Sequence, residues 1–179
     1  MLVVKNLFIF MVRCKVKLKY IFLLTALLAP VAYADWDTQT DDDVFSGGKS
    51  AMLLGVLSSV GHNAVFDCSE NKLMFSFLEE DNNSMLDAPI PVDLFVKIDD
   101  NEIAKLNALM MRRNSKFMGA ESSDEDNIIK LLKQLRSAKK KIIVGIQDKD
   151  GENRQSYSGD VVNSTNAVSN FVKACNIKL

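Results

Sequence analysis

Acid–base chemistry in this 179-residue sequence would have to use its sole histidine or its carboxylates. His62 lies between Gly61 and Asn63, and a Ser-His-Asp hydrolase would need it as the general base. Glycine and asparagine on either side are typical of a hairpin turn, in which a histidine is usually solvated. No Gly-x-Ser-x-Gly nucleophile elbow occurs in the sequence. We therefore interpret His62 as a turn residue and predict no catalytic residues.

Carboxylates occur in short runs at 79–81, 99–100 and 124–126. Glycoside hydrolysis needs two of them facing each other across a cleft, usually beside aromatic side chains that hold the sugar, and Trp36 is the single tryptophan. Short acidic runs are more typical of loop tips and helix N-terminal caps. A cell-wall hydrolase remains an alternative function. It would be favoured by two carboxylates about 5–10 Å apart in a cleft, one with a raised pKa.

Two further motifs match phosphate and metal sites only in part. The sequence from Gly47 to Ser50 has the end of a phosphate-binding loop, but Asp43 stands where the first glycine is required. Asp148 begins a stretch like a calcium loop, but Gly151 comes two positions too early and the final glutamate is absent. Too few histidine and cysteine ligands are available for zinc. We predict neither a metal nor a cofactor.

The N-terminus has the pattern of a secretory signal peptide. A basic stretch from Arg13 to Lys19 leads into an apolar run from Ile21 to Ala29, and Ala32-Tyr33-Ala34 supplies the small residues that signal peptidase recognises. The apolar run is shorter than the roughly 20 residues needed to span a bilayer. We predict a signal peptide at 1–34, cleaved between Ala34 and Asp35. An uncleaved N-terminal anchor is the alternative.

Residues 35–179 are predicted to form a single periplasmic domain, whether translation starts at Met1 or at Met11. Without the five basic residues before it, this part has 17 Lys and Arg against 23 Asp and Glu, a net charge of −6. Nucleic-acid binding needs a net basic face, so we exclude it. No segment after the signal peptide is long and apolar enough to cross a membrane.

Two cysteines remain after the predicted cleavage, Cys68 and Cys175. In an oxidising compartment such a pair forms one intramolecular disulfide. A catalytic redox pair would be expected as Cys-x-x-Cys, a spacing that the sequence lacks. We therefore predict a structural disulfide between these residues.

Apolar runs separated by turn residues predict most of the strands. Runs at 51–58, 64–68, 72–78 and 92–98 have the length and composition of strands, although the first is also compatible with a short helix. Residues 148–151 have a hairpin-turn sequence between two further strands.

Three segments have helical periodicity: 102–114, a second segment that begins near Asp124, and 164–175. The fold class predicted is α+β: an antiparallel β-sheet with two or three helices packed mainly on one face. The disulfide would join the last helix to the strand that ends at Cys68.

Possible binding residues are few. Arg112, Arg113 and Lys116 form a basic cluster that could meet an acidic partner or an anionic polymer of the envelope, although basic residues at a predicted helix end also complement the helix dipole. Trp36 is the other possible binding residue. It stands in an acidic, Gly/Ser-rich lead-in at 35–50, and we predict that it anchors this segment on the domain.

The spacing of aromatic, glycine and cysteine residues resembles two groups of small exported bacterial proteins. The shared features are an early Trp36, a strand ending in Phe66-Asp67-Cys68, and a segment from Tyr157-Ser158-Gly159 into a helix that ends at Cys175. This arrangement is similar to the invasion-associated locus B family and to periplasmic accessory proteins of type VI secretion. The resemblance covers about two thirds of the domain, excludes 99–139, and implies a non-enzymatic role in the envelope or in secretion.

We therefore predict an exported, non-enzymatic binding protein that acts by protein–protein contact in the cell envelope, as a secretion accessory, an inhibitor or an immunity protein. Its expected partner is an envelope or secreted protein. A small-ligand or lipid-binding stress or virulence factor is an alternative, which an enclosed apolar pocket would favour.

Overall fold

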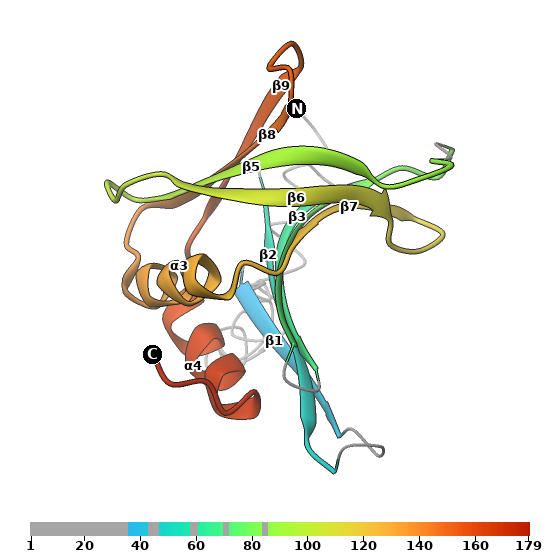
Figure 1. Ribbon diagram of the computed structural model, residues 1–179. Coiled ribbons are helices and arrows are strands. Elements are labelled where there is room, and N and C mark those ends of the chain that lie inside the picture. Colours follow the sequence, from blue (N-terminus) through green and yellow to red (C-terminus); the bar gives the residue numbers. More distant parts are fainter. Residues whose placement is uncertain (1–35, 43–46, 58–60, 70–71, 84–85) are drawn as a thin grey trace, which may run out of the picture. The chain divides into compact units, whose positions relative to one another are not determined.

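The computed structural model describes residues 36–42, 47–57, 61–69, 72–83 and 86–179. All strand pairs among these residues are antiparallel. Within these residues nine strands form one sheet in the order β1-β2-β3-β4-β7-β6-β5-β8-β9 (Figure 1). All of the described residues belong to one compact unit, Ala34–Leu179. The predicted signal peptide at 1–34 and its cleavage site lie outside the described residues.

The order of the strands in the sheet departs from their order in the chain, since β4 lies beside β7 and β5 beside β8. The strands are β1 (Trp36–Asp42), β2 (Lys49–Val56), β3 (His62–Ser69), β4 (Lys72–Glu80), β5 (Ile90–Ile98), β6 (Ala104–Arg112), β7 (Phe117–Ser122), β8 (Lys141–Asp148) and β9 (Arg154–Asp160). The helices are α3 (Glu125–Ser137) and α4 (Ser164–Ala174). The predicted α+β class is confirmed.

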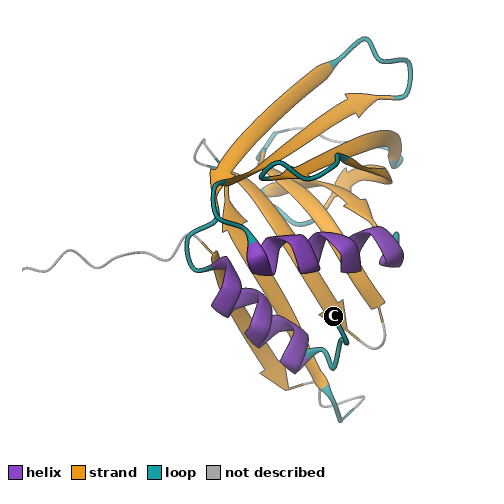
Figure 2. Cartoon of the chain, turned by 90° about the vertical axis from the view of Figure 1, so that its left-hand side faces the viewer, coloured by secondary structure: helices purple, strands orange, loops and turns teal. Residues whose placement is uncertain are grey.

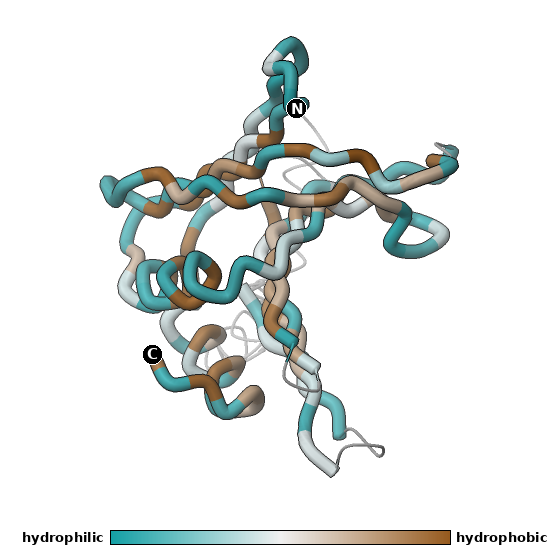
Figure 3. The backbone as a smooth tube through the Cα atoms, in the orientation of Figure 1, coloured by the Kyte–Doolittle hydropathy of each residue, from teal (hydrophilic) through white to brown (hydrophobic). Residues whose placement is uncertain are grey.

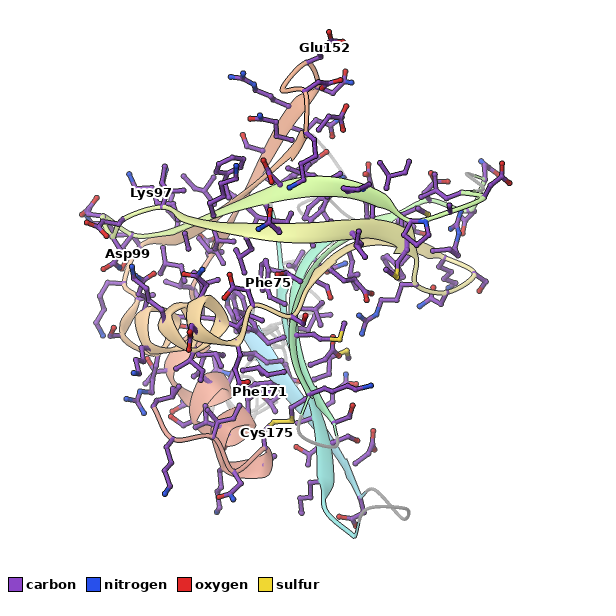
Figure 4. All side chains as sticks on the ribbon, viewed as in Figure 1. Phe75, Lys97, Asp99, Glu152, Phe171 and Cys175 are labelled. Atoms are coloured by element: carbon purple, nitrogen blue, oxygen red, sulfur yellow. A yellow bond between two sulfur atoms is a disulfide. The ribbon has the colours of Figure 1, made fainter. Side chains whose placement is uncertain are left out.

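Both helices pack on the same side of the sheet, which we call the inner face (Figure 2). Helix α3 contacts β4, β5 and β6, whereas α4 contacts β1 and β2. Because side chains alternate along a strand, every second residue points to this face. The core lies here, and its largest fully buried side chains include Phe66, Phe75, Phe77 and Phe171 (Figure 4 labels Phe75 and Phe171).

Trp36 is part of this core. Its side chain is fully buried, and its indole Nε1 donates a hydrogen bond to the carbonyl oxygen of Asp160 in β9 at 2.8 Å. The ring lies on Gly55, where a Cβ atom would come within 2.3 Å of it. Trp36 therefore joins β1 to the end of the last strand and has no exposed surface with which to bind a partner.

The prediction of a helix at 102–114 was wrong, because this segment is strand β6. The described residues contain two helices, α3 and α4, where two or three were expected. The apolar residues of β6 also fit a period of two: Ala104, Leu106 and Ala108 are buried, and the residues between them are exposed. Leu106 pairs with Leu94 of β5, and Met110 pairs with Ala120 of β7. Pairing on both sides decides between the two periodicities.

The expected cap of that helix is the turn between β5 and β6. Asp99 has a φ of 50°, and the N–H of Asn101 donates to the carbonyl oxygen of Ile98 at 3.1 Å. The Asp99 carboxylate accepts hydrogen bonds from the backbone N–H groups of residues 139–141, between 2.7 and 2.9 Å. These bonds lower the pKa of Asp99 despite its partial burial, and they attach the turn to the start of β8.

Other predicted elements are confirmed. Segment 51–58 is a strand rather than a short helix, since β2 covers most of it. Helix α3 begins after Asp124, whose carboxylate accepts a hydrogen bond from the N–H of Asn127 at 3.3 Å. Residues 148–151 form the turn between β8 and β9, and hydrophilic residues gather at the tip of this hairpin (Figure 3).

The predicted disulfide is present between Cys68 and Cys175. The two Cα atoms are 6.1 Å apart, and the bond joins the end of β3 to the residue that follows α4. The last helix is thereby fixed to the inner face of the sheet.

Candidate functional site

The predicted basic cluster lies at the hairpin between β6 and β7, but its members point in different directions. Neighbouring residues of a strand face opposite sides, so the side chains of Arg112 and Arg113 diverge. The Arg112 guanidinium donates to the carbonyl oxygen of Asp81. Lys116 is exposed in the turn, where its N–H donates to Asn114 Oδ1 at 2.9 Å. The structure therefore does not bring these three cations together as one patch.

Arg113 is the centre of a polar cluster on the outer face, the side of the sheet opposite the helices. Its Nη2 is 2.9 Å from Asp67 Oδ2 of β3, and its Nη1 is 3.1 Å from Glu121 Oε1 of β7. Nη1 also lies 3.3 Å from the hydroxyl of the buried Ser76. One side chain thus connects the end of β6 to three other strands.

Burial and pairing compete within this cluster. Burial raises the pKa of Asp67, and the charge and hydrogen bond of Arg113 offset this only in part. Burial disfavours the charged guanidinium as well, but Asp67 and Glu121 outweigh it and raise the pKa of Arg113. The cluster is stable only while all three partners are present, because each would otherwise be a poorly solvated charge.

Asp67 and Glu121 are the closest match to the carboxylate pair that a hydrolase would need. One has a raised pKa, as an acid catalyst requires. Both, however, bind the same Arg113, which occupies the position between them that a substrate bond would have to take. This geometry favours a structural bridge.

The outer face around this cluster is unusually apolar. A sheet with one solvated face normally alternates apolar and polar residues, but the outward residues of β2 are Met52, Leu54 and Val56. Val56 is 46% exposed, and Leu109 in β6 is 42% exposed. We call the partly exposed apolar residues of this face the outer apolar surface: Met52, Leu54, Val56, Met74, Leu109, Met111 and Phe117.

Strand register places this surface in the same rows as the arginine cluster, although Val65, which links Leu54 to the cluster, is fully buried. Leu54 pairs with Val65, Val65 with Ser76, and Ser76 with Glu121 of β7. Glu121 in turn pairs with Leu109, so one row of residues crosses five strands. Beside it, Met52, Met74 and Arg113 line a hollow of about 390 Å³.

His62 lies on the inner face rather than in a solvated turn. It is the first residue of β3, its side chain is 16% exposed, and its Nε2 is 3.4 Å from Glu79 Oε1. Its ring stacks on Tyr157 of β9 with a centroid distance of 4.1 Å, and Tyr157 stacks on Phe77 in turn. The prediction of a solvated histidine was wrong, because the Gly61 turn ends one residue earlier.

Asp93 is the centre of a second charge cluster, in which the carboxylate is buried and its two lysine partners are exposed. Its carboxylate is bound by Lys105 of β6 at 2.8 Å and by Lys149 of the β8–β9 turn. Hydrogen bonds from these two lysines lower the pKa of Asp93. The carboxylate ties the β8–β9 hairpin to β5 and β6.

A groove of about 580 Å³ lies beside the disulfide. Three lysines (Lys49, Lys72 and Lys178) and Glu125 contribute to its walls, together with apolar side chains from β4, α3 and the C-terminal segment. No sequence signal indicated this site, because its residues come from five separate segments.

The part of the chain that the structure describes holds no candidate metal site and no candidate membrane span. No three histidine, cysteine or acidic side chains there are grouped as metal ligands. None of the described helices has the length and apolarity needed to cross a membrane.

Comparison with protein-family models, with curated proteins and with solved structures found no match to this chain. The resemblance to the invasion-associated locus B family and to the type VI secretion accessory proteins therefore stays a prediction.

Sequence reasoning missed the outer apolar surface, although a signal for it was present. In Ala51–Val56 the residues of both parities are apolar, which is expected of a strand buried on both faces. The helix that contacts β2, α4, lies on one face of that strand only. The partners of Arg113 had no comparable signal, since Asp67 is 46 residues away.

Proposed function

We propose that this protein is an exported, non-enzymatic binding protein that acts by protein–protein contact in the cell envelope, and that the outer apolar surface is where its partner binds. One observation supports this most strongly. The outward residues of β2 are apolar and partly exposed, while both described helices pack on the opposite face. Contiguous exposed apolar surface is the usual mark of an interaction site.

The composition of this surface also fits an interface. Methionine, aromatic residues and arginine are enriched at the centre of protein interfaces. Here Met52 and Met74 line one hollow with Asp67 and Arg113, and Met111 and Phe117 lie further along the same face. Arg113 is already held by two carboxylates, so a partner would meet a pre-ordered polar centre within an apolar surround.

Export and the lack of catalysis are part of the same proposal. The Cys68–Cys175 disulfide supports a periplasmic or secreted location after cleavage between Ala34 and Asp35, because such bonds persist in oxidising compartments. The carboxylates of Asp93, Glu121 and Asp67 are all largely buried and all bound by cations, which favours structural over catalytic roles. Secretion accessory, inhibitor and immunity protein are the types proposed.

Affinity capture from the native cell envelope tests this proposal. We compare the tagged wild type with a Val56→Glu/Leu109→Glu variant and with Val162→Glu, a control that places the same charge at a residue 58% exposed in the loop before α4. We expect wild type and control to retain one stoichiometric partner that the double variant loses. Equal capture by all three proteins, or none by the wild type, would contradict the proposal.

A further inference from the structure

The end of α4 builds one wall of the groove. Asn176 has a φ of 53°, and the N–H groups of Asn176 and Ile177 donate to the carbonyl oxygens of Lys173 and Val172 at 3.4 and 2.9 Å. This is the Schellman pattern, in which a left-handed residue reverses the chain and returns an apolar residue towards the helix. Ile177 and Lys178 are thereby placed along the groove.

Four other segments complete the groove, and the disulfide joins one of them, the end of β3, to that wall. Lys49 comes from the start of β2, Lys72 and Leu73 from the start of β4, and Ile129 from the second turn of α3. Cys68 and Cys175 both line the groove, so the covalent bond fixes its width. The site is therefore pre-formed rather than dependent on the tail alone.

The charge of the groove is opposite to that of the domain. Residues 35–179 carry 17 basic and 23 acidic side chains, yet three lysines and a single glutamate line the groove. Lys49 is 3.8 Å from Asp42. No carboxylate among the described residues forms an ion pair with Lys72 or Lys178. A local positive potential in an acidic protein attracts an anionic group.

The floor of the groove is apolar. Leu73 is buried, and Ile129 and Ile177 are partly buried against the core. An occupant must therefore present carboxylates to the lysines and apolar side chains to the floor. An extended peptide does both, because successive side chains point to opposite sides. A lipid chain would favour an enclosed cavity, whereas this groove opens to solvent.

We propose that this groove is a second binding site, which takes an acidic extended segment of a protein with alternating acidic and apolar residues. The carboxylates of the segment pair with Lys72 and Lys178, and its apolar side chains contact Leu73, Ile129 and Ile177. The site is independent of the outer apolar surface, so either can fail while the other stands.

Fluorescence anisotropy with a labelled Glu-Leu-Glu-Leu-Glu-Leu peptide tests the site on the exported protein. We expect binding that weakens as salt screens the lysines, and at least about tenfold weaker binding of the Gln-Leu analogue. Lys72→Glu/Lys178→Glu should weaken binding by a similar factor, whereas Lys133→Glu, on an exposed part of α3, should leave it unchanged. Val56→Glu/Leu109→Glu should also leave it unchanged.

A second variant changes the shape of the groove wall but not the charge of the groove. Asn176→Pro removes the N–H that bonds to Lys173 and cannot adopt a positive φ, whereas Asn176→Gly tolerates it. We expect the proline variant to lose most of the binding and the glycine variant to keep it. Absent peptide binding, equal binding of the Gln-Leu analogue, or full binding by the lysine double variant would overturn the proposal. So would dodecanoate binding at the groove without peptide binding, which would assign the site to a lipid.

Discussion

Side chains alternate between the two faces of the sheet, but the apolar residues of the two faces differ in burial. On the inner face, the side of the sheet that carries both described helices, Phe66, Phe75 and Phe77 are fully buried. On the outer face, Met52, Leu54 and Val56 are apolar but remain partly exposed around a charged cluster. Neighbouring residues of one strand thus serve different needs. The inner residues stabilise the fold, and we propose that the outer ones bind a partner.

Phe75 and Met74 make this comparison within β4, since they are adjacent and face opposite sides. Phe75→Ala should lower the free energy of unfolding by about 3–5 kcal/mol, because it leaves a cavity in the core. Met74→Ala should cost less than about 1.5 kcal/mol, because its side chain is partly solvated. Urea unfolding curves measure both, and equal losses would show that the outer face is packed as tightly as the inner one.

The disulfide is the next largest contribution to the inner face. Cys175→Ser should lower the free energy of unfolding by about 2–5 kcal/mol, because the unfolded chain is no longer constrained. Chemical reduction of the wild type should give a similar loss, which serves as the control. Unchanged stability in both cases would mean that packing alone holds α4 on the sheet.

Arg113 tests how the polar centre of the outer face is held. Arg113→Met should cost about 1–3 kcal/mol, because Asp67 and Glu121 lose the donor that compensates for their burial. Lys116→Met, in the exposed turn of the same hairpin, is the control and should change stability by less than about 0.5 kcal/mol. Thermal unfolding distinguishes them; equal effects would contradict a central role for Arg113.

Substitution of Asp93 should have the smallest effect on the free energy of unfolding, and this effect should depend on pH. The pKa of Asp93 is lowered in the folded protein, so its ionised form contributes stability above the ordinary value of 3.8, and this contribution is lost as the pH falls through the lower folded value. Asp93→Asn should therefore destabilise the protein at pH 7 but progressively less below 3.8. The pKa of Asp67 is shifted in the opposite direction, because burial raises it. The protonated Asp67 carboxyl therefore stabilises the folded state at low pH, and this contribution is lost as the pH rises through the raised pKa. Unfolding curves across pH 2–7 would contradict this if the Asp93→Asn difference did not change.

Local signals in the sequence were enough for several elements. Asp124 marks the start of α3, residues 148–151 predict the turn between β8 and β9, and the predicted compartment leads to the Cys68–Cys175 bond. The start of α3 and the β8–β9 turn depend on residues that are neighbours in the sequence, and the disulfide depends on the oxidising compartment that we predict for the whole chain. None required knowledge of which strands pair.

Strand β6 shows where such signals are insufficient. Leu106, Leu109 and Met110 fit a helical stripe, but pairing with β5 and β7 places Leu106 and Met110 on one face and Leu109 on the other. The same error grouped Arg112 with Arg113, which the strand separates. The groove depends on non-local pairing and had no sequence signal, whereas the apolar residues of both parities in Ala51–Val56 indicate a second apolar face of one strand but not the surface that it forms with other strands.

Calorimetric titration of the captured partner tests the central claim most directly. If the outer apolar surface binds that partner, the heat capacity change of binding will be negative, since apolar area leaves water. Val56→Glu/Leu109→Glu will then bind at least about tenfold more weakly, while Val162→Glu will bind as the wild type does. Unchanged affinity in the double variant, or a heat capacity change near zero, would contradict the claim.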